Sequence, residues 1–139
     1  MIVVDTDVLS EAMRAHPDPR VAVWLQRQPE AETFTTAITK AEILYGIEVL
    51  DLGKYRAGLS RAADLIFSGT FLRRVLAFDD EAAAHYAQIS ASRKISGRPI
   101  KTADAQIAAI ARLHGAVLAT RDESSFRDCG IRVVNPWKS

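Results

Sequence analysis

The chain has 139 residues, of which 48% are hydrophobic and 25% are charged, and its formal net charge is +1. This composition suits one globular domain with its own core. The small net charge neither requires nor excludes a nucleic-acid partner, because a local basic surface matters more than the total. A single cysteine excludes an internal disulfide, and no signal peptide is recognisable, so we expect a cytoplasmic protein. Membrane spanning is not expected, since no apolar run approaches the ~20 residues that cross a bilayer.

Apolar runs and helical spacing predict alternating strands and helices. Ile2 to Val4 form a continuous apolar run, as expected for a strand that is buried on both faces. Asp18 and Pro19 suit the N-cap and first position of a helix. The predicted strands are residues 2–4, 33–36, 74–78, 116–119 and 131–134. The predicted helices include residues 8–13, 19–25, 38–50, 59–67 ending at Ser68 and Gly69, a helix after Asp80, and 102–113.

This alternation implies right-handed crossovers and a parallel sheet with helices on both faces. We therefore predict an α/β fold. Residues 1–139 should form a single domain, because no linker or internal repeat divides the chain. Ligands of such sheets bind beyond the carboxyl ends of the strands, which is where Asp5 and Asp122 are predicted to lie.

Four acidic residues that are distant in the chain follow strands or lie early in helices: Asp5, Glu42, Asp104 and Asp122. Two of them have a simple structural explanation. Glu42 completes a possible capping box that begins at Thr39, and a carboxylate in a first helical turn, such as Asp104, is favoured by roughly 0.3–1 kcal/mol. Asp5 and Asp122 are different, because an acid that closes a buried strand must be hydrogen-bonded, paired or metal-bound.

Carboxylates that converge at one sheet edge need a cation. Two carboxylates about 4 Å apart repel by about 4 kcal/mol at an effective dielectric constant of about 20. Oxygen ligands without His or Cys favour magnesium or manganese over zinc. Such a site can polarise a phosphoryl oxygen and lower the pKa of an attacking water, so phosphodiester hydrolysis is the chemistry that fits.

The segments that contain these acids resemble the four signature segments of PIN-domain ribonucleases. They read VVDTDVLSE, TAITKAEILYGIE, KTADAQIAAIA and LATRDESSF. More narrowly, they are similar to the VapC-type toxins of bacterial toxin–antitoxin pairs, including the FitB-like branch. The segment NPW at 135–137 also resembles the ending of that branch. The resemblance covers the whole chain, 1–139, as a single PIN domain.

This resemblance implies a three-layer sandwich with a central parallel β-sheet of about five strands. It also implies endoribonuclease activity that depends on Mg²⁺ or Mn²⁺. The implied partners are an RNA substrate, a second copy in a homodimer and a cognate VapB/FitA-like antitoxin, with operator DNA bound only through the antitoxin.

The resemblance also assigns roles to single residues. Asp5, Glu42, Asp104 and Asp122 correspond to the acidic quartet that binds metal, directly or through water, and carries catalysis. Thr120 corresponds to the small polar residue that helps to hold the site.

Three further positions near the quartet carry separate expectations. Thr6 is expected to make a backbone or hydroxyl contact rather than to act in catalysis. Asp7 replaces a common Asn, and we favour a helix cap for it over a fifth carboxylate in the site. Lys40 stands where a small or apolar residue is expected, and it either points to solvent or touches a substrate phosphate.

Five cationic residues near Asp104 and Asp122 are candidates for a basic rim that binds RNA: Arg93, Lys94, Arg98, Lys101 and Arg121. An ordinary solvated surface is the alternative for each of them. The bound RNA would be single-stranded or looped, because sequence-specific readers usually target unstacked regions.

Two other functions are compatible with parts of the pattern. Asp5-Thr6-Asp7 after a strand also fits a haloacid-dehalogenase-like phosphatase with Asp5 as nucleophile, although that family does not explain Glu42 or the later acids. Alternatively, the acids hold a structural metal, and the chain is a non-catalytic partner in an antitoxin–DNA complex. A trapped phospho-aspartyl group at Asp5 distinguishes the first alternative, and growth arrest by an Asp5→Asn protein distinguishes the second.

Overall fold

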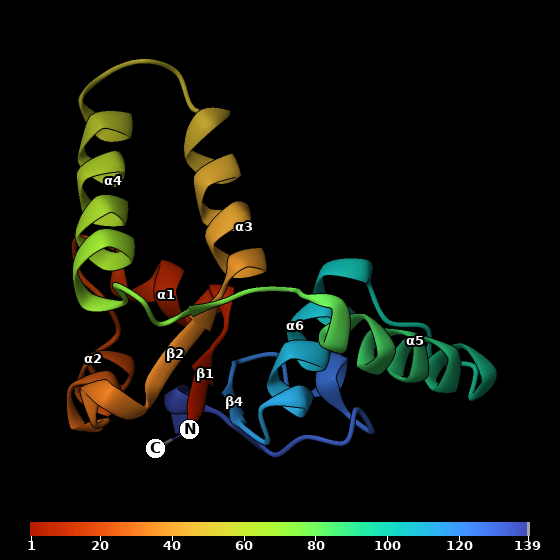
Figure 1. The fold of residues 1–139 in the computed structure, drawn as a ribbon. Helices are drawn as coiled ribbons and strands as arrows, with labels where there is room; N and C mark the ends of the chain where they lie inside the picture. The colour runs from red at the N-terminus through yellow and green to blue at the C-terminus, as the bar shows by residue number, and fades with distance from the viewer. Residues whose placement is uncertain (139) are drawn as a thin grey trace.

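A computed structural model describes residues 1–138 and contains a five-stranded parallel sheet in the order β3-β2-β1-β4-β5. The strands are β1 (Ile2–Val4), β2 (Thr33–Thr36), β3 (Val75–Leu76), β4 (Val117–Ala119) and β5 (Val133–Val134). The α-helices are α1 (Thr6–Ala12), α2 (Pro19–Arg27), α3 (Ala37–Glu48), α4 (Lys54–Leu65), α5 (Asp80–Ile95) and α6 (Thr102–Leu113). Figure 1 shows this arrangement, which confirms the predicted α/β fold with its central parallel sheet.

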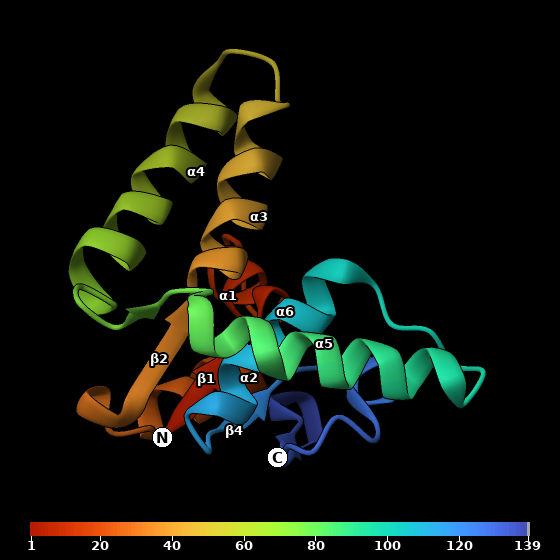
Figure 2. The ribbon, with the colours of Figure 1, turned by 45° about the vertical axis from the view of Figure 1, so that its right-hand side comes forward.

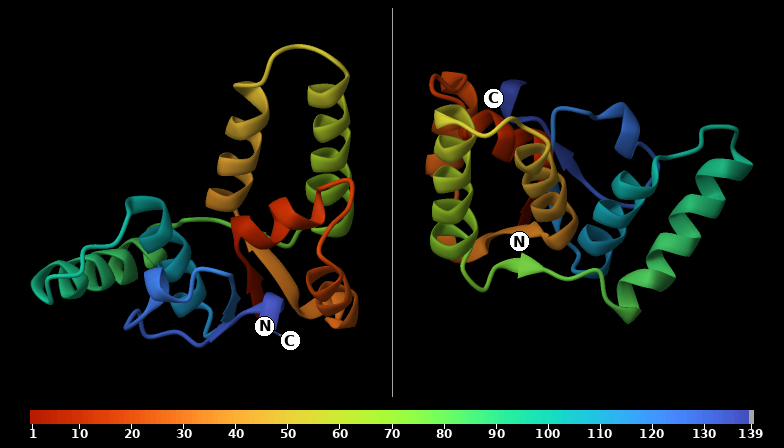
Figure 3. Two further views of the ribbon diagram at one scale, coloured as in Figure 1. Left: turned by 180° about the vertical axis from the view of Figure 1, so that it is seen from behind. Right: turned by 90° about the horizontal axis from the view of Figure 1, so that it is seen from above.

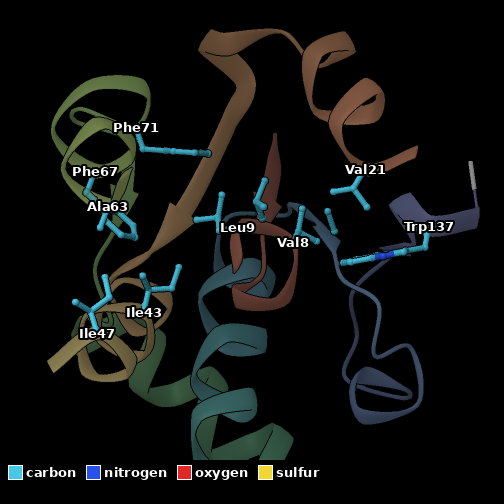
Figure 4. Packing of buried hydrophobic residues seen from close by; sticks show 11 residues of the cluster. Val8, Leu9, Val21, Ile43, Ile47, Ala63, Phe67, Phe71 and Trp137 are labelled. Atoms are coloured by element: carbon cyan, nitrogen blue, oxygen red, sulfur yellow. The ribbon is translucent and has the colours of Figure 1, made fainter. Parts of the chain in front are cut away.

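Helices cover both faces of the sheet. Neighbouring residues of β1 point to opposite faces, so they show which helices pack on each one. Val4 belongs to a core cluster with residues of α1, α2, α3 and α4, whereas Val3 belongs to a second cluster with residues of α5 and α6. Figure 3 shows α5 and α6 on the side opposite α2 and α4. The first cluster is shown in Figure 4, where Val8 and Leu9 of α1 lie between α3 and Trp137. The predicted three-layer sandwich is therefore confirmed.

Helices α3 and α4 form an antiparallel hairpin that projects beyond the carboxyl edge of the sheet (Figures 1 and 2). The predicted end of the second of these helices at Ser68 and Gly69 is wrong. A π-helical turn over Ile66–Thr70 continues it, closed by a hydrogen bond from the Phe71 N–H to the Ile66 carbonyl at 2.8 Å. Burial of Phe67 and Phe71 stabilises this turn by about 1.5–3 kcal/mol each, which exceeds the ~1 kcal/mol cost of a helical Gly.

The outer strands are shorter than predicted. β3 contains only Val75 and Leu76, and β5 contains only Val133 and Val134. Both lie at the edges of the sheet, where a strand has a neighbour on one side only. Within residues 1–138, no helix has the length and apolar character needed to cross a bilayer.

Candidate functional site

The strand order places the ends of β1, β2 and β4 side by side at one edge of the sheet. Asp5 follows β1, and its backbone N–H donates to the Ala119 carbonyl of β4 at 2.9 Å. Glu42 lies in the second turn of α3, which follows β2 directly. Asp104 lies in the first turn of α6, and this turn is at the same edge because α6 runs back to the start of β4. Together with Asp122, these residues form what we call the acidic cluster.

The buried hydroxyl of Thr120 contacts three acidic residues at this edge of the sheet, Asp5, Asp7 and Asp122. Its Oγ1 donates to Asp5 Oδ2 at 2.7 Å and accepts from the Asp122 backbone N–H at 3.1 Å. Asp7 Oδ2 lies 3.2 Å from the same hydroxyl. A hydroxyl has a single proton, so the shorter contact to Asp5 is the dominant one. Thr120 thereby holds the Asp5 carboxylate and the Asp122 backbone in a fixed relation.

A second network of hydroxyl groups orients Glu42. Thr6 Oγ1 donates to Glu42 Oε1 at 2.7 Å and lies 3.1 Å from Thr39 Oγ1. The capping role considered for Glu42 is wrong, because α3 begins earlier in the chain. Its N-cap is Thr36, whose side chain accepts from the Thr39 N–H at 3.0 Å. Glu42 is therefore free of capping and faces the site, and Thr6 makes the hydroxyl contact expected of it.

Asp7 also belongs to the site, and its predicted role as the cap of α1 is wrong. The N-cap of α1 is Asp5, which accepts from the Thr6 N–H at 2.8 Å. Asp7 instead accepts from the Arg121 backbone N–H through Oδ2 at 2.9 Å, and its Oδ1 is buried without a hydrogen-bond partner. The cluster therefore contains a fifth carboxylate, placed there because position 7 lies in the first turn of α1 and faces β4.

Ser124 and Ser125 are site residues that we did not anticipate from the sequence. Ser125 Oγ donates to Asp122 Oδ2 at 2.6 Å, and Ser124 Oγ donates to Asp122 Oδ1 at 3.2 Å. These bonds, chiefly the one from the Ser125 hydroxyl, lower the pKa of Asp122. An Asp followed at short range by two serines is a local signal for such a turn.

Burial and mutual repulsion raise the pKa of three carboxyl groups in the cluster. Asp5, which is only 6% exposed, has its pKa raised to about 7, mainly by burial and then by the charge of Asp7. The pKa of Asp7 is raised mainly by burial, with a contribution from Asp122. The pKa of Asp104 is raised by burial and then by the charges of Asp122 and Glu42. The five carboxylates thus act on one another electrostatically.

The donor set fits a hard divalent cation. Every candidate ligand is a carboxylate oxygen, and Asp7 Oδ1 is a buried oxygen that lacks a hydrogen-bond donor. A cation at this edge would relieve the repulsion that raises these pKa values. Within residues 1–138, no three His, Cys, Asp or Glu side chains lie close enough together to surround one ion in this conformation. The fit therefore rests on the chemistry of the donors and on their shared edge.

The cations predicted to form a basic rim separate into buried, paired and exposed groups. Arg93 is only 5% exposed and donates to the carbonyls of Arg98, Ser125 and Arg127, so it does not belong to a rim. Its guanidinium is needed inside the fold because those carbonyls have to be satisfied there. Arg98 is ion-paired with Asp128.

Lys94, Lys101 and Arg121 are exposed. Lys101 is electrostatically closest to the acids, since its charge opposes the rise in the pKa of Asp104. Arg121 lies over the Trp137 ring, 5.0 Å from its centroid. Lys40 is exposed, with its Nζ 5.7 Å from the centroid of the Phe67 ring, so its side chain contacts an aromatic ring of the core.

The raised pKa of Asp5 predicts how the stability of the metal-free protein depends on pH. A carboxyl group with a folded pKa of about 7 and a usual value of 3.8 contributes stability below pH 3.8 that is lost as pH rises through 7. Between pH 5 and pH 8, we expect this group to lower the free energy of unfolding by about 2–3 kcal/mol. Urea unfolding with chelator should show that loss in the wild type and a smaller loss in Asp5→Asn. Parallel pH profiles for both proteins would contradict the assignment.

Comparison with known proteins identifies the family and the fold. A family model described as PIN domain matches residues 2–131. The chain is 39% identical over 138 residues to a VapC ribonuclease of Sinorhizobium fredii and 39% identical over 137 residues to the toxin FitB of Neisseria gonorrhoeae, with 99% of each chain covered in both cases. The structure of FitAcB from Neisseria gonorrhoeae matches with a TM-score of 0.91 and 40% identity over all of both chains. The structure of FitAB bound to an IR36 DNA fragment matches with a TM-score of 0.92 and 39% identity, covering 99% of this chain and 96% of that one.

Proposed function

The chain belongs to the PIN-domain family, and we propose that it is a metal-dependent endoribonuclease that acts as the toxin of a toxin–antitoxin pair. The observation that carries this proposal is the acidic cluster at the carboxyl edge of the sheet. Relatives at 39% identity named as a VapC ribonuclease and as the toxin FitB support it. A cytoplasmic location is consistent with an RNA substrate.

In this proposal Asp5, Glu42, Asp104 and Asp122 hold Mg²⁺ or Mn²⁺. When bound, the ion supplies positive charge that polarises a phosphoryl oxygen and acidifies a water molecule. The chain's own residues set the geometry, because Thr120 orients Asp5 and Thr6 orients Glu42. Asp104 lies at the same edge, where its carboxylate could accept the proton of the attacking water.

The proposed antitoxin would cover a groove beside Glu42. This groove has a volume of about 410 Å³ and lies between α1, α3 and α4. Its lining continues from Thr6 and Glu42 to apolar side chains such as Ile43 and Leu59, which suits a partner segment with an apolar face and a basic residue near the carboxylates. The similar structures FitAcB and FitAB, the latter bound to an IR36 DNA fragment, support a protein partner and an association with DNA. We propose in addition that the chain forms a homodimer and meets DNA through its antitoxin.

The phosphatase alternative is not supported. The PIN-domain match covers residues 2–131 and thus includes the segment Asp5-Thr6-Asp7. In the structure, Asp5 is 6% exposed and both its oxygens accept hydrogen bonds, from the Thr6 N–H and the Thr120 hydroxyl. These contacts favour a fixed ligand over a nucleophile that must reach a phosphate.

Cleavage of cellular RNA by antitoxin-free protein tests the proposal. We expect cutting with Mg²⁺ or Mn²⁺, none with chelator, and a loss of at least about 100-fold in Asp5→Asn, because removing a ligand charge weakens the site. Asp51→Asn, an exposed acid in the loop between α3 and α4, is the matched control and should cut like the wild type. Growth arrest that persists in Asp5→Asn without cutting by either protein would favour the non-catalytic binding partner.

A further inference from the structure

A depression of about 730 Å³ lies beside the acidic cluster, and its polar lining is dominated by arginine. We call it the arginine pocket and define it by Arg14, Arg20, Arg121 and Trp137. It adjoins the acidic cluster, since the backbone N–H of Arg121 donates to Asp7 at 2.9 Å. Arg14 also lines the groove that contains Thr6 and Glu42, so it lies between the two hollows.

Arg14 is held in place by a buried acid. Both carboxylate oxygens of Glu11 accept from Arg14 Nη1, at 3.3 and 3.2 Å, and Glu11 Oε2 also accepts from the Asp18 N–H at 3.1 Å. The Glu11 side chain is 9% exposed, whereas that of Arg14 is 67% exposed. The Glu11 carboxylate is therefore buried and bonded within the fold, while most of the Arg14 side chain stays exposed at the edge of the pocket.

Arg20 is held in the same way by Asp18. Its Nε and Nη2 donate to the two Asp18 oxygens at 3.1 and 2.7 Å, an arrangement that leaves Nη1 for another acceptor. The bonds from Arg20 lower the pKa of Asp18 to about 2, and the charge of Arg121 contributes to the same effect. Arg121 thus lies near enough to the Asp18 carboxylate for its charge to act on it, and both residues line the pocket with Arg20.

Arg121 is positioned by an aromatic ring instead of an acid. Its guanidinium carbon lies 5.0 Å from the centroid of Trp137, and within residues 1–138 no carboxylate forms an ion pair with it. Trp137 is itself fixed, because its backbone N–H donates to Asn135 Oδ1 at 2.9 Å and its ring extends toward Val8 and Val21 in the core (Figure 4). The three arginines face two acids, so the pocket carries a surplus of one positive charge.

We propose that the arginine pocket binds the phosphodiester backbone of the RNA strand next to the bond that is cut. This inference rests on the proposed function and names residues through which the same site holds its substrate. Five carboxylates create a negative field that repels phosphate, so an RNA strand needs cations beside the cluster to approach it. Arg121 directly precedes Asp122 in the chain and supplies such a cation on one side, and Lys101 supplies one near Asp104.

The chemistry of the pocket fits a flexible strand. Guanidinium groups that are already oriented bind phosphate with less loss of side-chain entropy than free ones. The volume lies within the range of about 300–1,000 Å³ that is usual for small-ligand sites, which is enough to admit a nucleotide. The strand would thus run from Lys101 across the acidic cluster to Arg121 and then to Arg14 and Arg20.

Equilibrium binding of RNA to a cleavage-deficient protein tests this inference. The Asp104→Asn protein is titrated into a fluorescein-labelled, mixed-sequence single-stranded RNA of about 12 nucleotides, and anisotropy is measured over a range of salt concentrations. Adding Arg121→Gln should weaken binding about tenfold and reduce the slope of log affinity against log salt by about one. Adding Arg20→Gln as well should reduce both further. Arg61→Gln, an exposed arginine of α4 that makes no ion pair within residues 1–138, is the charge-matched control.

The outcomes separate this inference from the proposed function. Wild-type cleavage of RNA combined with equal binding by the Arg121 and Arg61 variants overturns the pocket's role and leaves the nuclease proposal standing. In that case another ligand, such as an acidic segment of a partner protein, occupies the pocket. Loss of binding in the Arg121 variant without any wild-type cleavage supports the pocket and rejects the nuclease. In cleavage-competent protein, Arg121→Gln should raise KM about tenfold with kcat largely retained, since the contact lies outside the reacting atoms.

Discussion

Replacing Asp104 with asparagine is expected to lower the rate of RNA cleavage by at least about 100-fold while making the metal-free protein more stable. The two effects have one cause. Asp104 is half-buried in the first turn of α6, and burial and the charges of Asp122 and Glu42 raise its pKa. A neutral side chain of the same shape removes that repulsion, but it also removes the charge of a proposed metal ligand and proton acceptor.

Two measurements on the same preparation check this prediction. Initial rates of cleavage of labelled RNA with Mn²⁺ report catalysis, and urea unfolding at pH 8 with chelator reports stability. Asp51→Asn is expected to change neither quantity, because Asp51 is exposed in the loop between α3 and α4. A variant that lost both activity and stability would show that Asp104 acts mainly as a structural residue of the helix start.

The second large effect is expected at Arg93, which holds the segment behind Asp122. Its Nε donates to the Arg98 carbonyl at 2.7 Å, and its Nη1 donates to the carbonyls of Ser125 and Arg127 at 2.8 and 3.1 Å. Replacement with methionine keeps much of the volume but leaves these buried carbonyls without a donor. Since hydrogen bonds to charged groups are each worth roughly 1.5–3 kcal/mol, losing these three should lower the free energy of unfolding by about 4.5–9 kcal/mol.

Urea unfolding at pH 7 measures this loss, and Lys94→Met is the matched control. Lys94 is the next residue along α5 and is exposed, so its replacement should change stability by less than about 0.5 kcal/mol. If Arg93→Met instead retained full stability and weakened RNA binding as a surface cation does, the burial seen in the structure would not describe the working protein.

Much of the site could be predicted from the sequence because it depends on local rules. An apolar run buried on both faces, followed by an acid, predicts a central parallel strand and a carboxylate at its carboxyl end, as found for β1 and Asp5. Helical periodicity and Gly115 predicted α6 closely, and therefore the position of Asp104 at its start. Carboxylate donors without His or Cys indicate the class of metal from their chemistry alone.

Local rules could not decide which competing partner a polar side chain takes. Asp7 and Asp5 are both acceptable helix caps. In the structure Asp5 is the N-cap of α1, and Asp7 lies in the site. A capping box from Thr39 to Glu42 is equally plausible from the sequence. In the structure, however, Thr36 ends β2 and is itself the N-cap of α3. These choices depend on where the preceding strand ends, because the strand's pairing with its neighbours fixes the register of the next helix.

The α/β fold, the family and the four acids whose placement and type indicate a metal-dependent chemistry were all predictable before folding, because they follow from periodicity, element order and donor type. The three-dimensional arrangement was needed to show that Arg93 is internal, that Asp7 is a fifth carboxylate and that Arg14, Arg20 and Arg121 line one pocket. The physical reason is that burial and pairing depend on which distant segments meet. Residues 14, 20 and 121 carry no common local pattern, and they come together only because α1, α2 and the end of β4 pack around Trp137.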